Sequence, residues 1–321
     1  MIPVEHPHLV IAASTHPGMR GKENEDRYSV SAFRMSLEDP TPSLLAILAD
    51  GIGGHHGGEV AAELAVKAIK SHVMQPSAQE PAQILSQALV QASQDILSHS
   101  KSDPILHGMG TTCVCAWIIG NRLYAASAGD SRLYLQRGAK LSRLTTDHTW
   151  IQDALQKGTL TPAQARGHPN AHIIRRFLGS ANPLTPDLRL RLSSNESDAQ
   201  AESNQGLKLL PGDRLVLCSD GLTDLVKDGE ILEILRTSRI ELSAEHMVNV
   251  ANSRGGHDNI TVITLEMPPA AGITRPLRPD REIQPALSDP KDRPPVAWWR
   301  ISLLGVAILL LVLLLAYTYL H

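Results

Sequence analysis

Acidic side chains stand beside glycine at the ends of apolar segments, in places far apart along the chain. Asp50 and Asp220 each follow a short apolar run and precede a glycine, and Asp130 follows Gly129. Asp258 stands just before another apolar run. Carboxylates at the ends of buried strands are the groups that bind divalent cations or transfer protons.

A hairpin turn is the simpler explanation of an Asp-Gly pair, because such pairs adopt the backbone conformation of tight turns. Asp50-Gly51 and Asp220-Gly221 fit it poorly, since helical spacing of apolar residues follows both. Carboxylates brought together in a poorly solvated place raise one another's pKa unless a cation neutralises them. The sequence therefore predicts a cation site assembled from distant segments.

The kind of cation follows from the kind of ligand. Carboxylate and carbonyl oxygens suit Mg²⁺ or Mn²⁺, whereas zinc favours His or Cys. Two such ions can stabilise the attacking and leaving oxygens of a displacement at phosphorus. Arg20 lies five residues before Glu25, and a guanidinium matches a phosphate dianion; taken alone, Arg20 would be a solvated surface charge.

Strand and helix patterns that position these residues come in separate blocks, which predicts an α+β fold. The predicted strands are 28–33, 44–49, 111–119, 122–128, 132–136, 215–218 and 260–266. The predicted helices are 60–73, 81–97, 227–237 and 244–253. Strands 111–119, 122–128 and 132–136 are expected to be consecutive and antiparallel, and the polar segment 193–206 is expected to be a solvated loop without chemistry.

The C-terminal part of the chain differs in composition. Residues 301–320 carry no charge over 20 positions, a length that as a helix crosses the roughly 30 Å core of a bilayer. Basic residues precede this segment and only His321 follows it, which predicts a cytoplasmic N-terminal part. We therefore expect a soluble domain over 1–267, a Pro-rich linker over 268–297 and a single-pass anchor in the cytoplasmic membrane over 298–321.

Composition excludes other classes. With 30 Lys and Arg against 33 Asp and Glu the net charge is −3, far from the basic excess that nucleic-acid binding needs. The three cysteines, Cys113, Cys115 and Cys218, have neither the number nor the spacing of a disulfide framework or a zinc site. We expect reduced thiols and no nucleic-acid partner.

Six segments taken together resemble, in order and spacing, those of the metal-dependent Ser/Thr protein phosphatases of type 2C. They are Arg20 to Asp26, Ala49 to His55, Gly108 to Thr112, Gly129 to Arg132, Ser219 to Leu222 and Gly256 to Thr261. The resemblance covers roughly residues 10–267. It implies a central antiparallel β-sandwich flanked by helices, with a binuclear Mn²⁺ or Mg²⁺ centre where metal-activated water hydrolyses phosphoserine and phosphothreonine.

The resemblance also implies a role for each matched residue. Asp50 resembles the bridging ligand, Gly51 the carbonyl ligand, and Asp220 and Asp258 the other carboxylates of the first ion. Glu25 resembles the acidic residue of the second ion, Asp26 an orienting carboxylate and Arg20 the phosphate clamp. Asp130 with Asp220 resembles a third, weaker metal site of bacterial members, and residues 147–186 correspond to a flap beside the site.

Two features of the sequence limit the roles that can be transferred from the family. Ile52 stands where some members have a histidine proposed as general acid, so that proton must come from water or another group; His55 or His56 could approach the site, although a histidine in a Gly-rich loop is more often a turn residue. His148 and Trp150 are expected to be structural or to contact peptide. Implied partners are phosphorylated proteins, among them a membrane Ser/Thr kinase and its substrates.

Two other function classes remain open from the sequence. One is a binding module that recognises phosphoproteins or metal without turnover, although none of the expected carboxylates is missing. The other is a membrane structural protein whose acidic turns merely pack. Metal-dependent hydrolysis of a phosphopeptide would distinguish a phosphatase from both of these classes.

Overall fold

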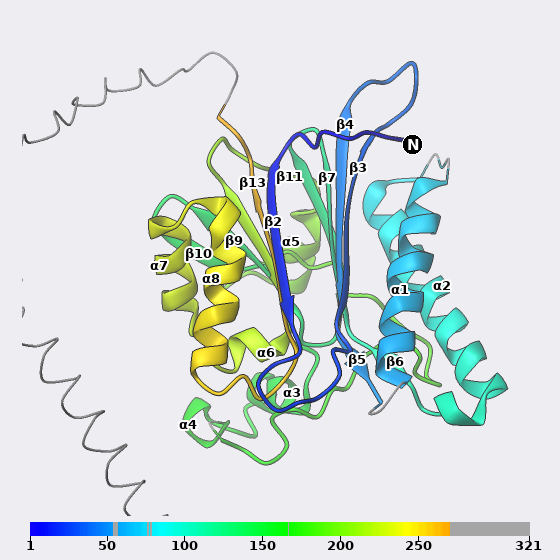
Figure 1. Ribbon diagram of the computed structural model, residues 1–321, viewed down its shortest axis with the longest axis vertical. Helices are drawn as coiled ribbons and strands as arrows, with labels where there is room; N and C mark the ends of the chain where they lie inside the picture. The colour runs from blue at the N-terminus through cyan, green and yellow to red at the C-terminus, as the bar shows by residue number, and fades with distance from the viewer. Residues whose placement is uncertain (54–56, 76, 78, 166, 270–321) are drawn as a thin grey trace, which may run out of the picture. The chain divides into compact units, whose positions relative to one another are not determined.

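Two antiparallel sheets lie face to face between two pairs of helices in the computed structural model (Figure 1). The structure describes residues 1–53, 57–75, 77, 79–165 and 167–269. Residues 1–270 form one compact unit. The predicted α+β class with a central antiparallel sandwich and flanking helices is confirmed for the described residues.

Each sheet joins strands from distant parts of the chain. The first has the order β1 (Ile2–Pro3), β3 (Arg27–Arg34), β4 (Pro42–Ala49), β7 (Cys113–Ile119), β8 (Arg122–Ala128) and β11 (Leu207–Lys208). The second has the order β10 (Lys140–Arg143), β9 (Arg132–Arg137), β12 (Arg214–Cys218), β13 (Ile260–Glu266) and β2 (Val10–His16). A short ladder pairs β5 (Gly51–Ile52) with β6 (Gly110–Thr111).

Helices cover the outer faces of both sheets (Figure 1). Against the first sheet lie α1 (Gly57–Met74) and α2 (Pro81–Ser102), and against the second lie α7 (Asp228–Thr237) and α8 (Ile240–Ser253). The shorter helices are η1 (Pro104–Leu106), α3 (Trp150–Gln156), α4 (Pro162–Ala165), α5 (Asp198–Ser203) and α6 (Asp220–Thr223).

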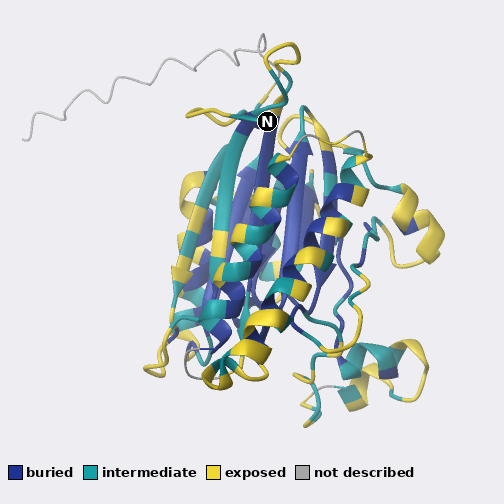
Figure 2. Cartoon of the chain, turned by 90° about the vertical axis from the view of Figure 1, so that its right-hand side faces the viewer, coloured by how far each residue is buried: buried dark blue, intermediate teal, exposed yellow. Residues whose placement is uncertain are grey.

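The central strands are apolar on both faces, which explains their unbroken hydrophobic runs. In β4 the side chains of Leu44 and Leu48 enter the core between the sheets. Leu45 and Ile47 point the other way, into the core beneath α1 and α2. Strands are accordingly the most buried part of the fold, and the helices expose their outer faces (Figure 2). Each such Leu or Ile, when fully buried, contributes about 1.5–3 kcal/mol.

One predicted pairing was wrong. The segments 111–119 and 122–128 do form a hairpin, β7 with β8, but β9 leaves that sheet and pairs with β10 and β12 in the other. The chain crosses between sheets at Gly129-Asp130-Ser131, where Gly129 has φ +111° and an added Cβ would lie 2.5 Å from the Cβ of Thr112. A sheet-to-sheet crossing, instead of a turn, thus brings Asp130 to the end of the sandwich.

The polar segment 193–206 also differs from its prediction as a solvated loop. Ser197 caps α5 in a capping box with Gln200, and Ala201 is fully buried. The Gln205 side chain hydrogen-bonds both backbone groups of Ala125 in β8. The segment is therefore ordered against the first sheet.

Within the described residues no helix has the length and apolar character needed to cross a membrane. The anchor predicted at 298–321 and nearly all of the linker predicted at 268–297 lie outside those residues.

Candidate functional site

The end of β4 is fixed by a network that reaches both sheets. The carbonyl oxygen of Asp50 accepts hydrogen bonds from the Thr112 N–H and the Thr111 hydroxyl, both at 2.8 Å. The Asp50 N–H donates to the Thr112 hydroxyl, which also bonds the hydroxyl of Ser131 at 2.8 Å. Asp50 and Ser131, the residue after Asp130, are therefore connected through the buried hydroxyl group of Thr112.

A second network fixes the loop that carries Glu25 and Asp26. The buried Ser219 hydroxyl donates to one oxygen of Asp26 at 2.9 Å. The Glu25 N–H donates to the side-chain oxygen of Asn259 at 2.7 Å, and the Asn259 amide donates to the Glu23 carbonyl at 3.0 Å. Residues next to Asp220 and Asp258 therefore position the acidic loop near the N-terminus.

Close backbone approaches require glycine at two positions. A Cβ on Gly51 would lie 2.4 Å from the carbonyl of Gly58 and 2.9 Å from that of Glu25, and a Cβ on Gly221 would lie 2.1 Å from the carbonyl oxygen of Asn259. Both glycines directly follow a site aspartate. The Asp-Gly pairs thus serve tight packing of strand ends, and the hairpin explanation is wrong for both: β5 and then α1 follow Asp50, and α6 begins at Asp220.

The carboxylates influence one another strongly, which shows that they converge. Burial raises the pKa of Asp50 well above its ordinary value, and the charges of Asp26, Asp220, Asp130 and Asp258 raise it further. The interaction between the side chains of Asp220 and Asp50 acts in the opposite direction on Asp220 and lowers its pKa.

The same causes act on the other members of the group. Burial raises the pKa of Asp26 to about 7, with contributions from Asp220 and Asp258, and raises that of Asp130 to about 8, with a contribution from Asp220. The pKa of Asp220 is raised to about 6 by burial and by the charges of Asp224 and Asp258. Such a group of carboxylates is stable in its charged form only beside cations.

Two oxygens of the group lack partners. Asp26 Oδ1 and Asp130 Oδ1 are buried, and the structure gives neither a hydrogen-bond partner. Buried polar atoms are normally satisfied, so each orphan oxygen needs a ligand. The donors here are oxygens, which fit hard divalent cations such as Mg²⁺ or Mn²⁺. On these observations the residues present fit the predicted cation centre.

The basic residues of the acidic loop lie at its exposed side. Lys22 Nζ is 3.5 Å from Asp258 Oδ1. Arg20 is exposed, and it forms no ion pair with the part of the chain that the structure describes. Glu25 is half-buried, and its pKa is raised by burial and by Asp258. The structure brings Glu25 and Asp258 together, whereas the clamp expected of Arg20 stays a prediction.

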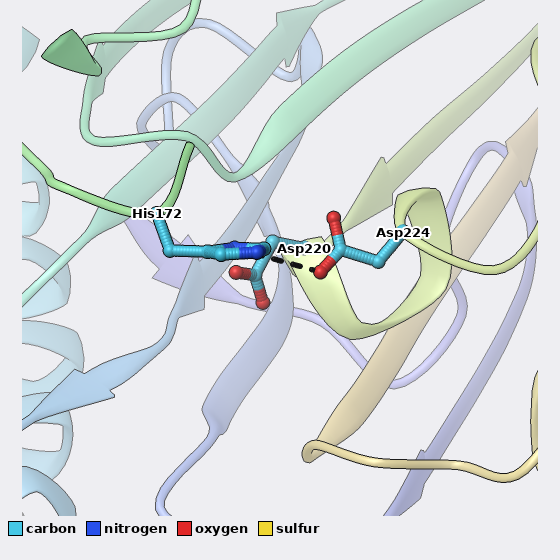
Figure 3. Close-up of side chains that lie close together, drawn as sticks. All are labelled: His172, Asp220 and Asp224. Carbon is cyan, nitrogen blue, oxygen red and sulfur yellow. Dashed lines mark ion pairs between the residues drawn. The ribbon is translucent and has the colours of Figure 1, made fainter. Parts of the chain in front are cut away.

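Three further residues lie near Asp220, and the sequence alone gave them no role: His172, Asp224 and His257. His172, Asp220 and Asp224 place possible ligand atoms within 4.8 Å of one another (Figure 3). His172 Nδ1 and His257 Nε2 each lie 3.7 Å from Asp224 Oδ2. Asp224 belongs to the turn of α6, four residues after Asp220, and a sequence search for i, i+4 carboxylates would have found it.

The flap is attached beside Asp130 through His148. The ring Nδ1 of His148 accepts the Gly129 N–H at 3.0 Å, and Nε2 bonds Asp187 at 3.0 Å. Trp150 stacks on His168 with ring centroids 4.9 Å apart. These contacts agree with the structural roles expected of His148 and Trp150. Ile52 lies in β5, while His55 and His56 fall outside the described residues.

Comparisons with known proteins agree with this geometry. The family model described as protein phosphatase 2C matches residues 19–253. A serine/threonine phosphatase of Listeria monocytogenes serotype 4b is 33% identical over 257 residues, which span 78% of this chain and 93% of the relative. The Mycobacterium tuberculosis serine/threonine protein phosphatase PstP is 34% identical over 259 residues, 81% of this chain, but the match spans only 45% of that relative.

Solved structures show the same fold. The crystal structure of the M. tuberculosis phosphatase PstP/Ppp has a TM-score of 0.68 at 32% identity, with 81% of this chain and 99% of that chain covered. A structure of the PstP catalytic domain in complex with two manganese ions has a TM-score of 0.65 at 32% identity, covering 80% and 97%. With a family model over most of its length and relatives above 30% identity, this chain belongs to the protein phosphatase 2C family of serine/threonine protein phosphatases.

Proposed function

We propose that this chain is a metal-dependent protein serine/threonine phosphatase that hydrolyses phosphoserine and phosphothreonine. The observation that carries the proposal is the convergence of Asp26, Asp50, Asp130 and Asp220 at one end of the sandwich, with pKa values raised by burial and by one another. Family membership supports it.

The roles of the residues are part of the proposal. Asp50, Asp220, Asp258 and the Gly51 carbonyl would hold the first cation, and Glu25 with Asp50 the second. Asp130 and Asp220 would hold a third, weaker ion. When bound, the cations neutralise the carboxylates, bind the substrate phosphate and supply a water of lowered pKa.

The chain's own residues hold the carboxylates in position and would bind the substrate phosphate. Ser219 donates to Asp26 and leaves its other oxygen available. Thr111 and Thr112 occupy the Asp50 carbonyl and N–H, so that the backbone of residue 50 cannot rotate. Arg20, at the exposed edge, would bind the phosphate dianion as it arrives.

Hydrolysis of a phosphothreonine peptide tests the proposal. The full chain is expected to turn over the peptide with Mn²⁺ or Mg²⁺, to lose activity on chelation, and to regain it when either metal is restored. Asp220→Ala should lower kcat/KM at least about 100-fold, the cost typical of removing an electrostatic stabiliser. Asp95→Ala, at a half-buried position of α2 outside the carboxylate group, is the control and should leave kcat/KM unchanged. Well-folded protein that binds the peptide without releasing phosphate would instead be a binding module.

We also propose that the enzyme is tethered to the cytoplasmic face of the inner membrane and acts on phosphoproteins there, among them a membrane Ser/Thr kinase and its substrates. The uncharged run 301–320, the basic residues before it and the Pro-rich linker support this. A chain ended after Pro268 should keep its activity on a free peptide and lose efficiency on a membrane-bound phosphoprotein, because tethering raises the local concentration. Equal efficiency on both substrates would contradict tethering.

A further inference from the structure

A polar cavity on the second sheet lies outside the carboxylate centre. Its volume is about 750 Å³, and it is bounded by β10, by α3 of the flap and by the segment from Arg189 to Asp198. Four cationic side chains line it, Lys140, Arg143, Arg189 and Arg191, with one carboxylate, Asp198. Asp147 and Asp187 also pair with Arg143 and Arg189, so four cations face three carboxylates. Residues 1–267 as a whole carry 24 Lys and Arg against 29 Asp and Glu, a net charge of −5. A concentration of cations in an acidic domain selects for an anionic ligand.

The guanidinium groups are held in place before any ligand arrives. Arg189 donates to Asp187 through Nε at 2.8 Å and to Asp198 through Nη1 at 2.9 Å. Arg191 donates to the Thr146 hydroxyl at 3.2 Å and also pairs with Asp198. Side chains fixed in this way lose little conformational entropy when they bind, which favours recognition of an anion.

The donors around the cavity suit a phosphate ester better than a carboxylate. Besides the cations, the hydroxyl groups of Ser142, Thr145, Ser193 and Ser194 line it. A phosphate dianion offers three acceptor oxygens and matches a guanidinium fork, whereas a carboxylate offers two. The lining contains no group of carboxylates that could hold a cation pair, so a phosphate bound here would not be hydrolysed.

The cavity is connected to the carboxylate centre by a short stretch of chain. Thr146 in the cavity wall stands two residues before His148, so their Cα atoms are at most about 7 Å apart. The His148 N–H donates to the Gly129 carbonyl at 2.9 Å, and Asp130 follows Gly129. The cavity residue Arg143 shares the Asp147 carboxylate with Arg132, two residues after Asp130. The cavity wall and the crossing that carries Asp130 are therefore joined through Asp147 and His148.

We propose that this cavity binds a second phosphorylated residue of the substrate, held without hydrolysis while another phosphoresidue enters the carboxylate centre. The proposal rests on the function proposed above and deepens it, since it makes doubly phosphorylated segments the favoured substrate class. An extended peptide rises about 3.3 Å per residue, so a spacing of four to eight residues between the two phosphates spans about 13–26 Å.

The test compares matched threonine phosphopeptides that carry one phosphate, two phosphates at these spacings, or one phosphate with glutamates at the second position. Wild-type KM is expected to be about tenfold lower for a doubly phosphorylated peptide. Lys140→Glu should abolish that advantage, because the exposed Lys140 amine contacts the Leu192 carbonyl at the cavity rim and forms no ion pair with the residues that the structure describes. Arg191→Gln, with its melting temperature checked, is the second variant. Lys101→Glu, the same charge change on exposed α2, is the control and should keep the advantage.

Two further measurements separate this proposal from the proposed function. Hydrolysis of p-nitrophenyl phosphate, too small to occupy both places, should be unchanged in Lys140→Glu; failure of the wild type to hydrolyse it would overturn the phosphatase function. Fluorescence anisotropy of the doubly phosphorylated peptide in EDTA reports binding to the cavity whether or not the enzyme turns over. Equal wild-type KM and affinity for all three peptides would overturn the proposal, and so would a glutamate peptide that binds as tightly as the doubly phosphorylated one.

Discussion

Asn259 shows how one side chain can position several parts of a site. Its oxygen accepts the Glu25 N–H, and its amide donates to the carbonyls of Pro17 and Glu23. Its own carbonyl lies so close to residue 221 that only glycine fits there. The acidic loop, the start of α6 and the start of β13 are therefore located relative to one another by a single residue between Asp258 and Ile260.

The contrast between two glycines gives a prediction at this scale. In Gly221→Ala the new Cβ would meet the Asn259 carbonyl at 2.1 Å, whereas at Gly229 in α7 a Cβ would meet nothing within 4 Å. Gly221→Ala is expected to lower the free energy of unfolding by about 1–3 kcal/mol through overpacking. Gly229→Ala should raise it by about 0.5–1 kcal/mol, because alanine loses less entropy in a helix.

Urea unfolding of the two variants and the wild type measures both effects. Phosphatase activity should fall in Gly221→Ala, since Asp220 moves with its neighbour, and stay at the wild-type level in Gly229→Ala. Equal stability of the two variants would show that the strand ends are not packed as described.

At the scale of elements, the flap and the crossing between sheets are joined by buried ion pairs. Asp187 bonds His148 from one side and Arg189 from the other, and its backbone pairs with Ser127 in β8. Asp147 at the start of the flap binds Arg132 of β9 through two hydrogen bonds. The flap base is thus fixed to both sheets, and its outer part, α3 and α4, projects from that base.

Removing the Asp187 charge tests the anchor. Hydrogen bonds from Arg189 and His148 hold the pKa of Asp187 below its ordinary value. A depressed carboxyl pKa contributes stability that is complete above the unfolded pKa of about 4 and is lost as the pH falls further. Asp187→Asn should therefore cost about 3–5 kcal/mol at pH 7 and lose less stability than the wild type between about pH 4 and pH 3. Urea unfolding at these pH values measures the effect, with Asp95→Asn as control. If the wild type and Asp187→Asn lose stability in parallel, the role of Asp187 is contradicted.

The elements that the sequence predicted well are those whose local pattern and packing agree. β8 and β13 have the predicted bounds, and α1 and α2 extend the predicted helices by a few residues. β2, Val10–His16, was missed because its apolar alternation is broken by alanine, serine and threonine; its strand conformation comes from pairing with β13. The crossing of β9 to the second sheet was missed because local apolar alternation does not specify the partner strand.

The candidate site could be predicted in part for similar reasons. Asp50 and Asp220 are marked by apolar runs that end at Asp-Gly, and the structure brings them together. His172 and the cationic cavity gave no such signal. His172 reaches Asp224 only through the path of the flap, and the cavity joins β10 to residues about 50 positions later. Contacts of that kind depend on tertiary structure alone.

At the scale of the whole molecule, the carboxylate centre makes stability depend on pH and metal together. The pKa values of Asp220, Asp26 and Asp130, raised to about 6, 7 and 8, mean that the folded chain without metal keeps protons that the unfolded chain has released. Stability then falls as pH rises, here between about pH 4 and pH 8. A cation that displaces those protons restores the lost stability, and more of it at higher pH.

Thermal melts in EDTA and in excess Mn²⁺ measure this coupling. The rise in melting temperature caused by Mn²⁺ is expected to grow by several degrees between about pH 5.5 and pH 7.5. In Asp220→Ala the rise should be small at every pH. A wild-type rise that is the same at both ends of the range would show that the carboxylates stay charged without metal.

The place of β13 in the second sheet affects how the protein folds during its synthesis. Among the described strands, β2 lies at the edge of the second sheet and pairs with β13 alone, the last of these strands. The two pair along their full length, from Ile260 with His16 to Glu266 with Val10. Because a ribosome makes the N-terminus first, β2 emerges long before the strand that it needs. A nascent chain stopped short of residue 258 also lacks Asp258. On the function proposed above, a nascent chain that has not yet reached β13 is therefore expected to be inactive, because both its second sheet and its carboxylate group are incomplete.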